Sequence, residues 1–581
     1  MKKVLSAYLA IVAIVAVSCR GTEPEAVPAH DGPQPGEYSL PIIETTDMHG
    51  HMVETDNSGV HYRLAYIADK VEDYRQAGKD RLLLIDGGDL YQGASVSNLM
   101  SGWPMYVSMH RMGYDAAALG NHEFDWGFEN MVDPDATLPD YEWEGSSIVN
   151  DVPVVCANLY QNGSRVPATM DYVIVEKSAT DAHGNVVPVR IGIVGFAVEY
   201  SGSIITTQFI GKGYSIKEDY AAVNGIAREL EASGQCDATI LLVHGMADEV
   251  AGNLGKDSPF DLVAGGHSHQ TKSGRTAWGL AYIQGGRYCE HYAFADLWFT
   301  VDDSGKVTFR SADKLSGWIV NSSRDLHSFP GQNASDLSED ILAVSDYALA
   351  ATAAVQNEVI GHIKVSATSY PISGSGERAT VMGNWMCDII RRIGSADVAF
   401  VNAGGVRITM PLNGQPSRDI TAANVYEIFP FNNLTYVYNL TYADLLQVFE
   451  YSMTSGGGAL FTYMTGIDCR FVEYDHGTYS TYEVCSLDKD GTTIYQNGKW
   501  TGDWADRSVT LAVSEYLATT ERTDYYTGIA NPLLGWNSTS RLVSSTLVDN
   551  ENAIRVLRAE ASSSGGLLYI DTKPHFILVA Q

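Results

Sequence analysis

Acidic, imidazole and amide side chains recur in the first half of the chain, each time directly after a short apolar run. Such runs predict buried β-strands, and five of them lead into residues that could bind a metal ion or move a proton. In chain order these segments are Asp47-Met48-His49, Gly88-Asp89, Gly120-Asn121-His122-Glu123-Phe124-Asp125, His244 and His267-Ser268-His269. Because ligands of an open α/β sheet gather beyond the carboxyl ends of its strands, we expect the five segments to meet in one crevice.

The donor types limit the chemistry that this crevice could perform. Oxygen and imidazole donors without thiolate suit divalent ions such as zinc, manganese, iron or cobalt. Eight or so donors are too many for one tetrahedral ion, but they suit two ions that share a bridging carboxylate. Two such ions would attract a phosphate ester and lower the pKa of an attacking water toward ~7. The pattern therefore predicts a phosphoester hydrolase.

Each motif on its own also has an ordinary structural explanation. An Asp-x-His segment is usually a solvated loop, and a Gly-Asp pair is commonly a turn. A lone histidine after a strand, such as His244, is usually structural. Gly-Asn-His-Glu is more specific, and the order of all five segments after predicted strands favours the metal site over these alternatives.

The five segments resemble the motifs of calcineurin-like metallophosphoesterases. The longer match, over most of residues 37–301, is to the 5′-nucleotidase family, which includes 2′,3′-cyclic phosphodiesterases and UDP-sugar hydrolases. The resemblance implies that His122 stabilises charge on the phosphoryl oxygens or the leaving group and is oriented by Asp125. The implied ligands, with Asp89 as the bridge, are Asp47, His49 and His269 for one ion and Asn121, His244 and His267 for the other. Several relatives have Gln or Asn at the position of His269.

The second half of the chain resembles the 5′-nucleotidase carboxy-terminal domain in residues 383–388, 401–407 and 428–433. The resemblance implies that Asn402 hydrogen-bonds the substrate, that Arg407 contacts phosphate or ribose, and that Phe431 stacks on a base. A tight turn at Asn402 and core packing of Phe431 are the structural alternatives. Tyr516 is the candidate for a second stacking ring, although the Gly-Gly-Asp-Gly loop usual in relatives is absent from residues 515–526.

The elements that position these residues follow an α/β pattern. Apolar runs at 40–43, 82–85, 191–194, 240–243 and 261–264 predict strands that are buried on both faces. Helical spacing predicts one long helix over 337–358, then a helix at 382–393 and a strand at 398–401. The resemblance implies a four-layer α/β/β/α metallophosphoesterase domain at the amino terminus, followed by a mixed α/β domain.

The chain divides into five predicted segments. Residues 1–19 combine Lys2 and Lys3, an apolar stretch and small residues before Cys19, which resembles a bacterial lipoprotein signal; a plain secretory signal is the alternative. Residues 20–36 contain four prolines and predict a tether. The predicted remainder is a metallophosphoesterase domain at 37–301, a linker with the bridging helix at 302–359, and a substrate-binding domain at 360–581. We expect an exported protein, anchored in the cell envelope through lipid on Cys19.

Composition excludes several classes of protein. Of 581 residues, 45 % are hydrophobic and 19 % are charged, which is ordinary for a globular protein and unlike a disordered one. The 70 acidic residues outnumber the 38 basic ones, and the net charge of −32 repels a nucleic-acid polymer. Seven cysteines are present, and we expect a disulfide between Cys469 and Cys485, which flank a predicted hairpin.

The predicted function is a two-metal 5′-nucleotidase that releases phosphate from nucleoside monophosphates. A UDP-sugar hydrolase or a 2′,3′-cyclic phosphodiesterase of the same family is the first alternative. A thiosulfate-ester hydrolase is a more distant one. A non-catalytic binding lipoprotein on the same fold is the alternative from a different class.

Overall fold

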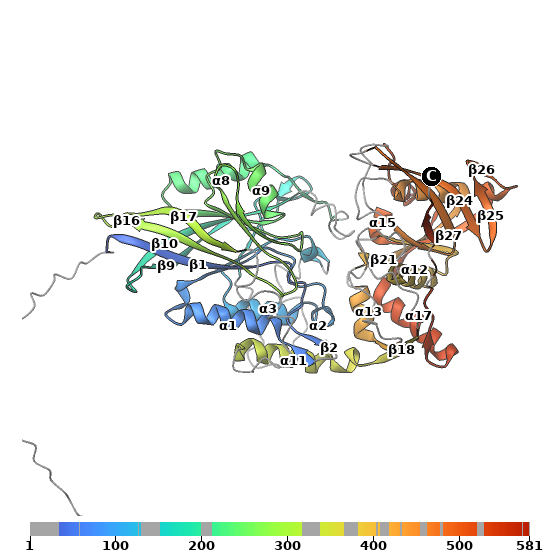
Figure 1. Ribbon diagram of the computed structural model, residues 1–581, viewed down its shortest axis with the longest axis horizontal. Coiled ribbons are helices and arrows are strands. Elements are labelled where there is room, and N and C mark those ends of the chain that lie inside the picture. The colour runs from blue at the N-terminus through green and yellow to red at the C-terminus, as the bar shows by residue number, and fades with distance from the viewer. Residues whose placement is uncertain are drawn as a thin grey trace, which may run out of the picture.

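Two domains joined by one long helix make up the molecule, seen in a computed structural model (Figure 1). The structure describes residues 34–56, 59–125, 127–128, 152–198, 209, 212–316, 337–364, 381–402, 405–406, 417–429, 433–453, 462–476, 480–519, 528–571, 573 and 575–579. Among the described helices, none combines the length and apolar character that a membrane crossing requires.

The amino-terminal domain is built on twelve strands that form one hydrogen-bonded sheet among the described residues. The strand order is β14-β15-β13-β12-β10-β9-β1-β4-β5-β6, with β16 beside β1 and β17 beside β16. The bounds are β1 Gly36–Thr45, β4 Leu83–Asp86, β5 Ala116–Ala118, β6 Val154–Val155, β9 Tyr172–Thr180, β10 Val186–Ala197, β12 Ala238–His244, β13 Leu262–Gly265, β14 Thr271–Arg275, β15 Ala281–Gly285, β16 Ala293–Val301 and β17 Val307–Ser316.

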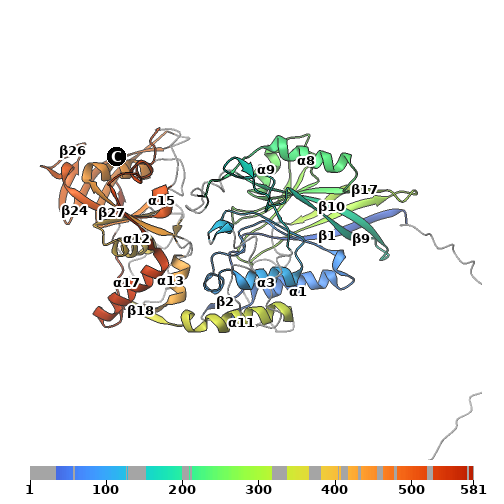
Figure 2. The same cartoon turned by 180° about the vertical axis from the view of Figure 1, so that it is seen from behind.

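Three apolar cores divide this domain into four layers. On β1, Ile42 faces a core shared by the two halves of the sheet, whereas Ile43 faces a core under the helices α1 (Arg63–Arg75) and α3 (Trp103–Met112). On β12, Ile240 faces the same central core and Leu241 faces a third core. The helices α8 (Tyr220–Ala232) and α9 (Ala247–Asn253) cover that third core, on the opposite side from α1 and α3 (Figure 2). The expected order of helix, sheet, sheet and helix is confirmed.

Parallel pairing brings the carboxyl ends of the central strands to one edge. Strand β1 runs parallel to β4, and β4 to β5, while in the other half β10 runs parallel to β12 and β12 to β13. The apolar runs predicted as strands at 82–85, 191–194, 240–243 and 261–264 coincide with these strands, except that Leu82 and Asp261 lie one residue before them. Their uniform burial fits a sheet that is covered on both faces.

The carboxy-terminal domain is mixed α/β. A five-stranded sheet of order β22-β19-β27-β21-β28 packs against α12 (Val381–Ile393) and α17 (Asp549–Ser564). A second five-stranded sheet has the order β26-β25-β24-β23-β30, and β18 pairs with β20 and β29. The bounds are β18 Val359–Lys364, β19 Val398–Asn402, β20 Ser417–Thr421, β21 Leu434–Thr441, β22 Thr462–Thr465, β23 Asp468–Asp475, β24 Ser480–Lys489, β25 Thr492–Gln496, β26 Lys499–Trp500, β27 Ser508–Ser514, β28 Leu542–Val548, β29 Leu567–Leu568 and β30 Phe576–Leu578.

The predicted bridging helix is confirmed as α11 (Glu339–Gln356), which leads into β18. It packs along α1 and α3 of the first domain, and its amino terminus is capped by the side chain of Ser338. On the other side of the boundary, α13 (Ala422–Ile428) packs against α11 and α2 (Ser95–Asn98). The two domains therefore touch beside the edge that carries the polar loops.

The expected disulfide is wrong, although the expected hairpin forms. Strands β23 and β24 pair, but a register shift at Arg470 and Phe471 places Leu487 opposite Cys469. Cys485 lies in the bulge that this shift creates. Both thiols are free.

Candidate metal centre

Strained turns present the predicted ligands at the carboxyl edge of the sheet. Backbone φ is positive, in the left-handed region, at five of the seven predicted ligands: Asp47 (50°), His49 (47°), Asp89 (58°), His267 (70°) and His269 (57°). Non-glycine residues seldom adopt this conformation, and such strain concentrates at functional sites because the surrounding structure must hold it.

Backbone hydrogen bonds hold the first two turns together. The N–H of Asp47 donates to the carbonyl of Gly88, and the N–H of His49 donates to the carbonyl of Asp89, both at 2.9 Å. Gly88 has a φ of 93°, and a side chain there would begin 2.8 Å from the backbone nitrogen of Gly120. Only glycine fits this close approach of three loops.

The structure brings one group of predicted donors together around Asp47, His49 and His269. The Nε2 atoms of His49 and His269 are 3.1 Å apart, and His269 Nε2 is 3.6 Å from Asp47 Oδ1. Asp47 is fully buried, and its Oδ1 accepts no hydrogen bond from any residue that the structure describes. A buried carboxylate oxygen without a hydrogen donor fits a position that awaits a cation.

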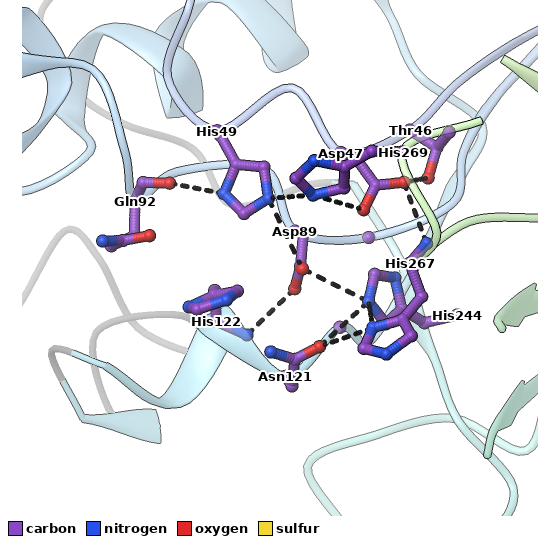
Figure 3. Close-up of polar contacts among 12 residues, drawn as sticks. Thr46, Asp47, His49, Asp89, Gln92, Asn121, His122, His244, His267 and His269 are labelled. Carbon is purple, nitrogen blue, oxygen red and sulfur yellow. Dashed lines mark hydrogen bonds and ion pairs between the residues drawn. The ribbon is translucent and has the colours of Figure 1, made fainter. Parts of the chain in front are cut away.

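A second group contains Asp89, His244 and His267, with Asn121 beside them (Figure 3). Asn121 Oδ1 lies 3.2 Å from His244 Nε2 and 3.0 Å from His267 Nδ1. Asp89 Oδ2 lies between the two groups, 3.3 Å from His244 Nε2 and 3.6 Å from His49 Nε2. Within each group the carboxylate and imidazole donor atoms lie within 4.8 Å of one another, so each could hold a metal ion.

Carbonyl groups behind the imidazoles fix which ring nitrogen faces the centre. His49 Nδ1 is 2.7 Å from the carbonyl oxygen of Gln92, and His244 Nδ1 is 2.8 Å from that of Gly87. A proton on Nδ1 makes each of these hydrogen bonds and leaves the Nε2 lone pair directed at the other donors. This arrangement is typical of histidines that bind metals. The residues present therefore fit two divalent ions.

The charges within the centre also call for cations. Burial raises the pKa of Asp47 to about 7. Burial lowers the pKa of His244, but the adjacent Asp89 carboxylate outweighs it and raises that pKa to about 10. Burial disfavours ionised Asp89, yet the imidazoles of His244 and His122 hold its pKa well below the usual range. A proton on His244 thus takes the place of metal charge, and a proton and a metal ion would compete for this imidazole.

His122 and Asp125 form a pair at the border of the centre. His122 Nδ1 lies 2.8 Å from Asp125 Oδ2, and both residues are buried. The backbone N–H of His122 donates to Asp89 Oδ1 at 2.9 Å, and its ring meets that of His49 edge-on at 5.1 Å. The ring is therefore oriented next to both donor groups.

Two buried carboxylates support the centre and were missed as functional residues in the sequence. Glu123 accepts three backbone N–H groups, from Asp89, Leu90 and Gly120. Asp86 accepts the N–H of Gly88 and the hydroxyl of Thr45. Glu123 lies inside the Gly-Asn-His-Glu motif, and this position in the sequence could have indicated its supporting role.

Of the candidate substrate residues, the structure describes Asn402 and Tyr516, both in the second domain. Asn402, at the end of β19, is buried and lines a cavity of about 20 Å³ with Asn433, Ser514 and Asp549. Tyr516 lies in α15 (Glu515–Thr519), half-buried against the apolar core of that domain. Arg407 and Phe431 lie outside the described residues.

Comparison with known families identifies both domains. Residues 40–271 match the model of the calcineurin-like phosphoesterases. Residues 359–501 match the model of the 5′-nucleotidase C-terminal domain. The first match contains all seven predicted ligands together with His122 and Asp125.

Curated relatives and a solved structure share this organisation. Endonuclease YhcR of Bacillus subtilis is 24% identical over 84% of this chain, which covers 37% of that protein. A 5′-nucleotidase of Vibrio parahaemolyticus is 23% identical, with 78% of this chain and 81% of that protein covered. The crystal structure of a 5′-nucleotidase precursor from Thermus thermophilus superposes with a TM-score of 0.63 at 18% identity, covering 94% of this chain and 100% of that one. The last comparison shows that the two folds are alike.

Proposed function

The chain belongs to the metal-dependent phosphoester hydrolases that join a calcineurin-like phosphoesterase domain to a 5′-nucleotidase C-terminal domain, and we propose that it hydrolyses nucleoside monophosphates to nucleoside and phosphate. The observation that carries the proposal is Asp89, whose Oδ2 lies within 3.6 Å of an imidazole from each of two donor groups. A carboxylate so placed suits the bridge of a two-metal centre.

In this proposal each donor group holds one divalent ion. Asp47, His49 and His269 would hold one ion, Asn121, His244 and His267 would hold the other, and Asp89 would hold both. The ions, when bound, would supply positive charge for the phosphoryl oxygens and activate the attacking water. The ligand set of nitrogen and oxygen atoms is compatible with zinc or manganese.

His122 and Asp125 act on the reacting group in this proposal. Asp125 holds the imidazole through Nδ1, so that Nε2 is the atom left to meet the substrate. A proton held at Nε2 would be donated to a phosphoryl oxygen or to the leaving oxygen. The backbone N–H of His122 donates to Asp89, and this hydrogen bond fixes the position of His122 relative to the two groups of metal ligands.

The second domain selects the substrate in this proposal. Asn402 would hydrogen-bond the nucleoside, Arg407 would contact phosphate or ribose, and Phe431 and Tyr516 would stack on the base. Support comes from the match of residues 359–501 to the 5′-nucleotidase C-terminal domain. The packing of Tyr516 against the core gives it the weakest support of the four.

One observation favours a second candidate within the family. Residues 515–526 lack the glycines of the usual base-binding loop. A UDP-sugar hydrolase or a 2′,3′-cyclic-nucleotide phosphodiesterase uses the same metal chemistry with a different leaving group, so it remains the alternative activity.

We also propose export to the cell envelope with a lipid on Cys19. The support is the signal-like sequence of residues 1–19, which lie outside the described residues, and the word precursor in the name of the similar Thermus protein. Labelling of the expressed protein with radioactive palmitate, compared with Cys19→Ala, tests the anchor. Equal labelling of both proteins would contradict it.

A substrate panel tests the activity. The purified protein is freed of metal by chelation, reloaded with zinc or manganese, and assayed for phosphate release from AMP, a UDP-sugar and 2′,3′-cyclic AMP. We expect AMP turnover that chelation abolishes and metal restores, and that Asp89→Asn lowers by at least ~10³-fold without loss of the fold. Turnover that is indifferent to both chelation and Asp89→Asn would refute the proposal. Preference for either other substrate would select the alternative.

A further inference from the structure

The loop after β15 has a strained backbone, and the proposed mechanism assigns this loop no role. Tyr288 and Cys289 are consecutive non-glycine residues with φ of 56° and 51°, and they follow Gly286 at 84°. Two adjacent side-chain-bearing residues in the left-handed region cost free energy, on the order of 1–3 kcal/mol each. Such a conformation persists only where the surrounding structure imposes it. It therefore suggests that the side chains of this loop have a function.

Hydrogen bonds on both sides of Tyr288 impose the conformation. Its backbone N–H donates to the carbonyl of Asp47 at 2.8 Å, and its carbonyl accepts from Arg63 Nη1 at 3.0 Å. Arg63 is itself buried and is held by Glu54 and Glu290. The loop is thereby tied to the backbone of a predicted metal ligand, so its position relative to the centre is fixed.

The Tyr288 ring forms one wall of the first donor group. It stacks on the ring of His51 with a centroid distance of 4.1 Å. It meets the rings of His269 and His49 edge-on, at 5.4 and 5.7 Å. The ring is therefore in direct contact with two of the predicted ligands of the first group.

The guanidinium of Arg287 lies over this ring. Its Cζ is 4.8 Å from the ring centroid of Tyr288, so at most about 10 Å separates it from the His269 ring. Arg287 is exposed, and none of the described carboxylates forms an ion pair with it. Arg63, by contrast, is neutralised by two carboxylates. In a protein of net charge −32, an arginine beside the centre that pairs with no carboxylate of the described residues is suited to binding an anionic ligand.

We propose that Arg287 is a specificity-determining residue that binds a second phosphate of the substrate, the one next to the phosphate being hydrolysed. The inference rests on the proposed function, because it takes the first phosphate to lie against the donor groups. A guanidinium presents paired N–H donors that match phosphate oxygens, and the Tyr288 ring restricts where it can lie. A monophosphate ester offers no group at this position, so the contact would leave the proposed hydrolysis of monophosphates unchanged and extend it to substrates with two linked phosphates.

Kinetics of AMP and ADP with Arg287→Ala test the proposal. We expect the KM for ADP to rise about tenfold, with kcat for both substrates and the KM for AMP changed less than twofold. Arg287→Lys, which keeps the charge and loses the paired donors, should give an intermediate KM for ADP. Arg228→Ala, at an exposed arginine on the far helix α8, is the matched control and should change neither substrate. Equal changes for AMP and ADP, or no change for either, would overturn the proposal.

A binding measurement separates this proposal from the proposed function. Calorimetry is performed on metal-loaded His122→Ala, with and without Arg287→Ala, using AMP and ADP and then inorganic phosphate and pyrophosphate. A selective loss of about tenfold in affinity for the diphosphate member of each pair supports the role of Arg287, even if neither nucleotide is hydrolysed. If the unsubstituted protein turns over neither nucleotide but this selectivity in binding is present, the result counts against the nucleotidase proposal alone. Loss of affinity for both members, or for neither, would count against Arg287.

Discussion

The carboxylate of Glu123 accepts the backbone N–H of Asp89 at 3.0 Å, so a residue that follows β5 holds the proposed bridging residue that follows β4. The same carboxylate accepts the N–H groups of Leu90 at 2.8 Å and Gly120 at 2.7 Å. Three donors on one buried side chain join the two loops. The position of Asp89 therefore depends on a neighbour that contributes no donor atom to either group.

Replacement of Glu123 by Gln tests this dependence. The amide places an NH₂ where one carboxylate oxygen accepted, so at least one backbone N–H then faces a donor. We expect kcat to fall about 10- to 100-fold and metal affinity to fall with it. Phosphate release and metal titration measure both. Glu229→Gln, on the exposed surface of α8, is the control. Wild-type metal affinity in Glu123→Gln would contradict the role.

The pairing of His122 with Asp125 predicts dependent losses of activity. His122→Ala should lower kcat by about 10²- to 10⁴-fold, and Asp125→Asn by about 10- to 100-fold. In the proposed mechanism Asp125 acts through the imidazole, so the double variant should lose no more than His122→Ala. Steady-state kinetics with metal analysis of each variant measures this. Multiplied losses in the double variant would show that Asp125 acts independently.

Asp261 predicts a dependence of stability on pH. Burial raises the pKa of this carboxyl from 3.8 to about 7, although it accepts the N–H of Thr239 at 2.8 Å. The folded state then binds the proton more tightly than the unfolded state, so Asp261 lowers the free energy of unfolding as pH rises from about 4 to about 7. Asp261→Asn should remove this part of the decline, on the order of 4 kcal/mol. Urea titrations at several pH values measure it, with exposed Asp257→Asn as the control. An unchanged slope would contradict the shift.

The capping box of α14 (Tyr442–Ser452) predicts a local effect on stability. The Thr441 side chain accepts the N–H of Asp444, whose carboxylate accepts the N–H of Thr441 in return. Thr441→Ala should lower the free energy of unfolding by about 1 kcal/mol, whereas Thr441→Ser, which keeps the hydroxyl, should change it little. Thermal unfolding compares the two. Equal effects would assign the change to packing of the methyl group.

The sequence predicted the central strands and the residues at their ends, because both depend on local pattern. Apolar runs such as 240–243 form strands wherever both faces of a sheet are covered. His244 then had to emerge at the carboxyl edge, and parallel pairing brought it to Asp89. Only the strand pattern and parallel pairing are needed to place these residues, so the donor groups could be anticipated.

Long-range contacts could not be anticipated in the same way. The role of Glu123 depends on backbone N–H groups, which every residue carries and no sequence distinguishes. The failed pairing of Cys469 with Cys485 depends on the register of β23 against β24, which puts Leu487 opposite Cys469. The burial of Tyr516 depends on how α15 turns against its sheet. Arg407 and Phe431 lie outside the described residues, so their roles remain predictions.

The donor groups draw on the ends of five strands between Asp47 and His269, in both halves of the sheet. No shorter piece of the chain contains both groups, so binding of two ions in the proposed centre must wait until long loops have closed and the domain is assembled. A partly folded chain therefore lacks some of the ligands that the two ions need. Ion occupancy thus reports the completion of folding, and its binding energy adds to the stability of the assembled domain alone.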